Sequence, residues 1–324
     1  AKKPKLTAEN KKEKKRLAAE LKKKISAARE AALESSVEKS KANEIYREKR
    51  KADLTVAYEA DKKSLSGKAA EERKQRYETE MKVVDKDNIM TKMQMIFQDP
   101  IASINPRMTV REIIAEGLEI RGVKDKEYID KKVYEMLELV GLVPEHADRY
   151  PHEFSGGQRQ RIGIARAIVM QPDLIIADEP ISALDVSIQA QVINMFEELQ
   201  EKLGVAYLFI AHDLLVVRHI SKRIAVMYLG KIVEVADADE LNENPQHPYT
   251  KALKGCIPHL QRTPTSGRHR LHEIPGMVLG MAELGKDRCS FYERCPCGKP
   301  ECMEHNPPAK AIDAGHEVAC WLYS

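Results

Sequence analysis

Apolar positions divide this 324-residue chain into three regions of different character. In residues 1–90 they are sparse, and most other positions carry charges spaced to pair with neighbours four residues away. One weak helical stripe recurs every three or four residues: Leu17, Leu21, Ile25, Ala28 and Ala32. The pattern predicts a Lys/Glu/Ala-rich arm or insertion, helical or disordered, that remains in solvent.

From Met93 onward, apolar runs of strand length alternate with helical patterns, and the runs are MQMIF, DLIIAD, VAYLFIA and RIAVMYLG. This alternation predicts an α/β unit with a mainly parallel sheet over residues 91–237. Residues 238–324 are rich in Pro, His and Cys, and we expect them to form a small appended domain.

Charge follows the same division. Residues 1–90 hold 26 Lys and Arg against 17 Asp and Glu, whereas the rest of the chain is net acidic. The alternative to a solvated arm is a basic arm that touches nucleic acid or anionic lipid. Its acidic residues are interspersed and its aromatic residues are few, so no nucleic-acid partner is expected. No apolar run reaches the length of a membrane span, and no signal peptide is visible.

The string PDLIIADEP ends a predicted buried strand with Asp178 and Glu179. Ligands bind outside the carboxyl ends of strands in open parallel sheets. An aspartate there suits Mg²⁺, directly or through water. The neighbouring glutamate suits orienting or deprotonating an attacking water.

A second string, FSGGQRQRIGIARAI, predicts a helix capped by Ser155. Gly156 and Gly157 allow backbone N–H groups to approach an anion, and the helix N-terminus favours negative charge. We expect Ser155, Gly156, Gly157 and Gln158 to bind phosphate, with the arginines at 159, 161 and 166 contributing to that chemistry.

Three further polar residues follow or end predicted elements. Gln98 ends the MQMIF strand, and His212 follows VAYLFIA, which is predicted to be another buried strand. Asp185 lies in SALD, placed to reach a neighbouring subunit. An amide at Gln98 suits contact with both Mg²⁺ and water.

Together the ordered strings FQDP, FSGGQ, LIIADE, SALD and AHD resemble the ATP-binding cassette of ABC transporters over residues 93–235. The strings FQDPIASINPRMTV and NPQHPYTKAL narrow the resemblance to ATPase subunits of oligopeptide and dipeptide importers, with nickel importers as relatives. The resemblance implies a P-loop NTPase-like cassette, an incomplete RecA-like lobe plus a helical subdomain, with a Cys-rich C-terminal domain.

The family pattern implies roles for the matching residues. Gln98 is then the Q-loop glutamine, Asp178 the Walker B Mg²⁺ ligand, Glu179 the catalytic glutamate and His212 the switch histidine; Ser155–Gln158 form the signature and Asp185 the D-loop. ATP and Mg²⁺ are the implied cofactors. The implied partners are a second cassette in a heterodimer, two membrane permeases and, indirectly, an extracytoplasmic substrate-binding protein, at the cytoplasmic face of the membrane.

The Walker A motif G-x-x-x-x-G-K-[ST] is absent from the sequence. KSLSGKAAEE contains a Gly-Lys pair, but it lacks the first glycine and the hydroxyl residue, and no apolar strand precedes it. We therefore reject Lys68 as a phosphate ligand. The chain is interpreted as a fragment or a half-site, inactive alone, that offers its signature to a companion's ATP.

Six cysteines lie from Cys256 onward, and five are closely spaced. Such spacing without a secretory signal favours metal ligation over disulfides. In the resembled family some members hold a [4Fe–4S] cluster here, which implies the ligands Cys289, Cys295, Cys302 and Cys320. Zinc and unligated cysteines remain alternatives.

Two other functions compete with import. An SMC-type ATPase also places a signature after a charged coil, but its Q-loop lies on the other side of that coil. A translation-linked cassette protein would use residues 1–90 as a linker, and a complete Walker A motif should then follow.

Overall fold

The computed structural model describes residues 40–84, 92–256, 274, 276 and 287–323. These residues form two compact units, and the predicted boundaries at 90 and 237 do not coincide with their division. One unit contains the N-terminal helices with residues 92–94, 104–154 and 161–175, and the other contains residues 95–103, 155–160 and the described residues from 176 onward. The predicted stripe over residues 17–32 lies outside the described residues.

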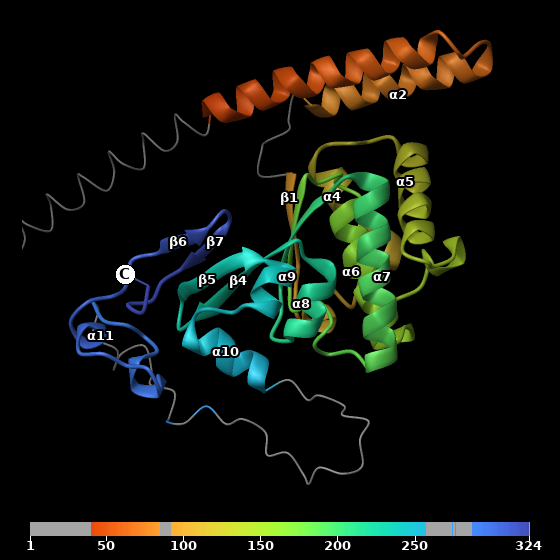
Figure 1. Cartoon of the computed structure of the whole chain (residues 1–324). Helices are drawn as coiled ribbons and strands as arrows, with labels where there is room; N and C mark the ends of the chain where they lie inside the picture. Colours follow the sequence, from red (N-terminus) through yellow and green to blue (C-terminus); the bar gives the residue numbers. More distant parts are fainter. Residues whose placement is uncertain (1–39, 85–91, 257–273, 275, 277–286, 324) are drawn as a thin grey trace, which may run out of the picture. The chain divides into compact units, whose positions relative to one another are not determined.

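Charged helices form the first part of unit one. Residues 40–62 are helical, and α2 (Lys68–Val84) lies beside them as the second arm of a hairpin (Figure 1). Tyr58 and Tyr77 stack across the hairpin with ring centroids 4.3 Å apart, and Arg73 pairs with Asp61. The stretch around Gly67, whose φ of +62° suits glycine, turns between two helices rather than following a strand.

Two capped helices complete the core of unit one. In α4 (Val110–Ile120), Thr109 and Glu112 cap each other's backbone N–H groups, and in α5 (Lys126–Leu139), Asp125 accepts from the N–H of Tyr128. Both helices bury one apolar face, which includes Ile114 and Val133. Short 3-10 turns, η2 (Pro144–His146) and η3 (Pro151–Glu153), lead to α6 (Gly156–Ile168).

The predicted strands form, but not all as expected. β1 (Met93–Ile96), β2 (Leu174–Asp178) and β3 (Ala206–Ile210) form a three-stranded sheet in the order β1-β2-β3, with α7 (Val186–Leu203) as the crossover between β2 and β3. β2 is central and partly buried. The prediction that VAYLFIA is buried is wrong, because β3 is an edge strand and Leu208 is 52% exposed.

Unlike VAYLFIA, RIAVMYLG lies outside the predicted parallel sheet. It forms β4 (Arg223–Tyr228), which pairs antiparallel with β5 (Lys231–Asp237). Leu229 and Gly230 connect them with φ values of +45° and +78°, the geometry of a tight hairpin turn. The hairpin forces an antiparallel partner, and a second sheet follows in the order β4-β5-β7-β6.

The C-terminal segment packs on this second sheet. β6 (Lys310–Asp313) and β7 (His316–Val318) extend the sheet from β5, and Phe291 joins a core with Ile224 and Tyr228. The remaining short elements of this unit are α3 (Pro100–Ser103), α8 (Leu214–Ile220), α9 (Ala238–Glu243), α10 (Pro248–Gly255), η4 (Tyr292–Arg294) and α11 (Glu301–Glu304). None of the helices in the described ranges is long and apolar enough to cross a membrane.

Candidate functional site

Glu179 occupies a strained position directly after β2. Its φ of +43° lies in the left-handed region, which costs a non-glycine residue free energy and is held only by surrounding bonds. Its N–H donates to the carbonyl of Ile210 at 3.0 Å, and its own carbonyl accepts from the N–H and hydroxyl of Ser182. These bonds fix the backbone of Glu179 between the ends of β2 and β3.

Two predicted site residues meet this carboxylate. Gln98 donates from Nε2 to one oxygen at 2.8 Å, and His212 Nδ1 lies 3.6 Å from the other. The Glu179 side chain is 29% exposed and that of His212 is 73% exposed, so solvent reaches the group. We call Gln98, Asp178, Glu179 and His212 the Glu179 site; Asp178 is the last residue of β2.

Ser155–Gln158, which we call the signature turn, starts α6 with a reciprocal cap. Ser155 Oγ accepts from the N–H of Gln158 at 3.4 Å, and Gln158 Oε1 accepts from the N–H of Ser155 at 3.0 Å. A Cβ on Gly156 would have room, since its nearest neighbour would be 3.9 Å away. A Cβ on Gly157 would lie 2.6 Å from the side chain of Ile188, so this glycine also serves packing on α7.

The expectation for the arginines needs correction. Arg161 donates from Nη1 to the carbonyl of Val140 at 2.7 Å, so it fastens the end of α5. Burial lowers the pKa of Arg166, with Glu116 acting against that change. Both arginine side chains therefore interact with other parts of the protein. The arginines of α6 are not all available to bind phosphate.

Asp185 lies on the surface at the start of α7. Its carbonyl accepts from the N–H groups of Ile188 and Gln189, and its carboxylate makes no capping bond to the helix. Gln189 reaches back to the carbonyls of Ile181 and Leu184, which holds the loop in place. The loop thus presents Asp185 outward.

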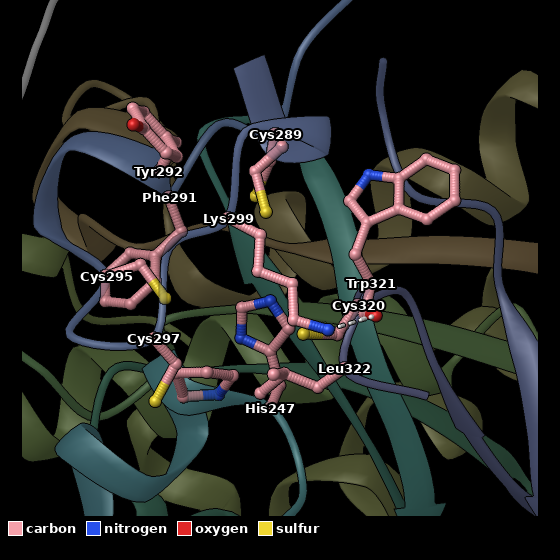
Figure 2. Close-up of a pocket in the computed structure, with 12 residues that line it drawn as sticks. His247, Cys289, Phe291, Tyr292, Cys295, Cys297, Lys299, Cys320, Trp321 and Leu322 are labelled. Atoms are coloured by element: carbon pink, nitrogen blue, oxygen red, sulfur yellow. Dashed lines mark hydrogen bonds between the residues drawn. The ribbon is translucent and has the colours of Figure 1, made fainter. Parts of the chain in front are cut away.

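Five of the six cysteines line one pocket in the C-terminal segment (Figure 2), and Cys256 is exposed outside it. We call this the thiol pocket; the residues that define it are His247, Cys289, Cys295, Cys297, Cys302 and Cys320. The void between these side chains is about 10 Å³, the space of about one water molecule.

Burial disfavours ionisation of three of these thiols. It raises the pKa of Cys295 to about 11 and also raises the pKa of Cys289 and Cys320, with smaller contributions from neighbouring cysteines. A bound cation would reverse this effect. Among the described residues, no three His, Cys, Asp or Glu side chains are arranged to hold a single metal ion.

A buried carboxylate that sequence reasoning missed lies beside the thiol pocket. Glu234 in β5 has a fully buried side chain and accepts from the N–H groups of Gln246 and His247 at 2.6 and 3.0 Å. His316 Nε2 of β7 lies 2.8 Å from the same carboxylate. His247 in turn caps α10, since its Nδ1 accepts from the N–H of Tyr249 at 3.1 Å. Burial lowers the pKa of His247 to about 4.

Comparison with protein families identifies the class. The ABC transporter family matches residues 58–182, and the oligopeptide/dipeptide transporter C-terminal region matches residues 233–302. The first match covers the signature turn and the Glu179 site except His212, and it confirms the predicted cassette fold. It also begins within the segment that we expected to be an arm.

Individual relatives show to which ATP-binding proteins of the ABC transporter family this chain is similar. The chain is 53% identical to the oligopeptide transport ATP-binding protein AppF of Bacillus subtilis, over 73% of this chain and 71% of that protein. It is 48% identical to OppF of Salmonella typhimurium, over 74% and 71% of the two chains. It is 68% identical to OppF of Bacillus subtilis over 52% of this chain, and it spans only 55% of that relative.

The chain belongs to the oligopeptide-transport branch of the ABC transporter ATP-binding proteins. Among solved structures, cbiO1 of Clostridium perfringens, described as part of the ABC transporter complex cbiONQ, is 25% identical with a TM-score of 0.44, over 48% of this chain and 61% of that one. The nickel, SMC-type and translation-linked alternatives are not favoured by these relatives.

Proposed function

We propose that this chain is the ATP-binding subunit of an importer of oligopeptides or dipeptides. One observation supports ATP hydrolysis by this subunit. Gln98 donates a hydrogen bond to one carboxylate oxygen of Glu179, and His212 approaches the other oxygen. The relatives named above support the transport part, and the C-terminal family match supports peptides as cargo.

The Glu179 site has the acid–base and Mg²⁺-binding side chains of ATP hydrolysis, but the sequence lacks the Walker A loop that would hold the phosphates against them. Glu179 orients the attacking water and accepts its proton, while Gln98 and His212 hold the carboxylate in place. Asp178 is the residue that would hold Mg²⁺, which neutralises charge on the phosphates when bound. The strained backbone at Glu179 is consistent with such a role, because strain of this kind is concentrated at functional sites.

The signature turn acts on a second nucleotide. We propose that the N–H groups at the start of α6 face the terminal phosphate of ATP bound by a companion cassette, and that Asp185 faces the same companion. Helix N-termini favour anions for electrostatic reasons, and both glycines leave the approach open. Two permeases then couple cassette closure to transport at the cytoplasmic face of the membrane, with an extracytoplasmic binding protein delivering the peptide.

ATP hydrolysis by a mixture tests the proposal. The chain is combined with a companion cassette that carries a Walker A motif, and Mg²⁺-dependent phosphate release is measured for the mixture and for each component. We expect turnover in the mixture well above the sum of its components. Turnover equal to that sum would contradict the proposal.

The same phosphate-release assay on Glu179→Gln then tests whether Glu179 takes part in ATP hydrolysis. Glu197→Gln on α7 is the control. If the chain alone hydrolyses ATP and loses that activity in Glu179→Gln, the site is complete without a recognisable Walker A motif. In that case the proposal that the signature turn serves a companion is wrong.

For the thiol pocket we propose a [4Fe–4S] cluster on Cys289, Cys295, Cys302 and Cys320, ahead of zinc. Thiols are the ligands that such clusters require, and these four cysteines line one pocket. A cluster is larger than the void, so binding must widen the pocket.

Metal analysis tests this second proposal. Chain purified without oxygen should contain iron and labile sulfide, and Cys289→Ser should lose most of both. Cys256→Ser is the matched control, because Cys256 lies outside the pocket. Protein with neither iron nor sulfide would contradict the proposal, and zinc in their place would favour the alternative.

A further inference from the structure

The string NPQHPYT has a structural role that the proposed ATPase chemistry does not explain. His247 precedes α10 as its N-cap, and Pro248 is its first helical residue. Glu234 fixes the backbone here, because it accepts the N–H groups of Gln246 and His247. The backbone and the ring of His247 are therefore both held in place.

The capping bond determines which ring nitrogen carries hydrogen. A backbone N–H only donates, so Nδ1 of His247 must accept the bond from Tyr249 with its lone pair. The ring hydrogen of the neutral imidazole then resides on Nε2. An Nε2 that carries hydrogen is a donor and not a metal ligand.

This donor belongs to the thiol pocket. His247 is 2% exposed, and its ring lies among the cysteine side chains (Figure 2). Among the described residues, the ring of His247 makes its hydrogen bond through Nδ1. Cysteine sulfurs line the same pocket as His247 and can accept a hydrogen bond from Nε2. A cysteine sulfur is a strong acceptor only as a thiolate.

We propose that His247 donates a hydrogen bond from Nε2 to a sulfur of a thiolate-bound metal centre in the thiol pocket. This inference rests on the cluster proposed above and gives His247 a positioning role, outside the set of ligands. A hydrogen bond to sulfur stabilises negative charge on the centre. Because reduction adds negative charge, the bond raises the reduction potential of the centre.

Redox titration of the cluster, followed by its electron paramagnetic resonance signal, tests the inference on the full chain. His247→Asn keeps a side-chain acceptor for the cap of α10 but is too short to replace the donor. We expect iron content equal to wild type and a more negative reduction potential. His247→Gln keeps both an acceptor and an N–H donor, so it should recover part of the shift. His219→Asn, on exposed α8, should change neither quantity.

The outcomes separate this inference from the proposals on which it rests. Iron present with an unchanged potential in His247→Asn would overturn the donor role and leave the cluster intact. Iron lost from both His247→Asn and His247→Gln, with unfolding midpoints at the wild-type value, would make His247 a ligand and overturn the donor role as well. No iron in the wild-type chain would overturn the cluster and this inference together, whatever the ATPase measurements show.

Discussion

Glu179 and Glu234, two glutamates of the same unit, lie in opposite environments. Glu179 ends a strand in a left-handed conformation, is partly open to solvent and has one side-chain donor at 2.8 Å. Glu234 lies inside a strand, is fully buried and meets two backbone N–H groups and the ring of His316. The first carboxylate is partly open to solvent, whereas the hydrogen-bonding capacity of the second is used within the protein.

The difference shows how local structure decides what a carboxylate does. A buried, fully bonded carboxylate holds elements together, here β5, β7 and the start of α10, and it is costly to disturb. A strained and accessible carboxylate contributes little to stability and remains available for chemistry. Substitutions at the two positions should therefore separate stability from activity.

The largest effect on stability is expected for Glu234→Ala. Removing the carboxylate leaves the N–H groups of Gln246 and His247 and the ring of His316 buried without their acceptor, at a cost of about 3–5 kcal/mol. Denaturant unfolding measures the change. Glu240→Ala is the control, because that side chain is 43% exposed and lies 3.5 Å from His316. A loss below about 1 kcal/mol in Glu234→Ala would contradict the assigned role.

Acid should weaken the same region through His247. Its pKa is lowered from 6.5 to about 4, mainly by burial and also by Lys251, while Glu234 opposes the shift. The unfolded chain therefore binds a proton between these values that the folded chain does not. The contribution of neutral His247 to the free energy of unfolding is fully present above pH 6.5. It falls by roughly 3 kcal/mol as the pH drops to 4.

Unfolding of the metal-free protein at several pH values measures this loss. In His247→Asn the part of the pH dependence due to His247 should disappear, leaving the contribution of the carboxylates. Equal pH dependence of the two proteins would show that His247 does not titrate in this way.

A smaller effect is expected at the signature turn. Ser155→Ala removes the side-chain half of the cap and should destabilise the protein by about 0.5–2 kcal/mol. The bond to Gln158 is long at 3.4 Å, which favours the lower end of that range. Ser155→Asn should restore most of the loss in thermal unfolding. No change in Ser155→Ala would mean that the cap does not support α6.

The smallest stability effect is expected for Glu179→Gln. The amide oxygen still accepts from Gln98, and the side chain is partly solvated, so the free energy of unfolding should change by less than about 0.5 kcal/mol. The same denaturant assay as for Glu234→Ala provides the comparison. A loss as large as that of Glu234→Ala would remove the distinction between the two glutamates.

Much of the Glu179 site could be predicted from sequence, because its residues directly follow strand-length apolar runs. Asp178, Glu179 and Gln98 were placed correctly at strand ends, and α6 begins beside Ser155 as expected. The antiparallel hairpin of β4 and β5 was not predicted, because its turn residue Leu229 gives no signal of a left-handed conformation.

Glu234 could not be predicted, because a β-bulge disrupts the alternation of β5. The register shifts between Val226 and Met227, so Val233 and Glu234 are both buried although they are adjacent, and Ile232 is 54% exposed. Read as a regular strand, the charged residue belongs on the solvent face. Its donors also come from residues 12, 13 and 82 positions away, beyond any local pattern.

The most direct test of the central claim is ATP turnover by the mixture of companion cassette and Gly156→Asp chain. A Cβ at Gly156 has room, and a negative charge at a helix N-terminus stabilises the helix. The variant should therefore fold at least as stably as wild type, while its carboxylate repels the terminal phosphate of the companion's ATP and lowers turnover by about 10²-fold or more. Lys126→Asp, which places an aspartate at the start of α5 and makes the larger charge change of two units, should leave turnover unchanged. Full turnover with folded Gly156→Asp would show that the signature turn does not face a phosphate.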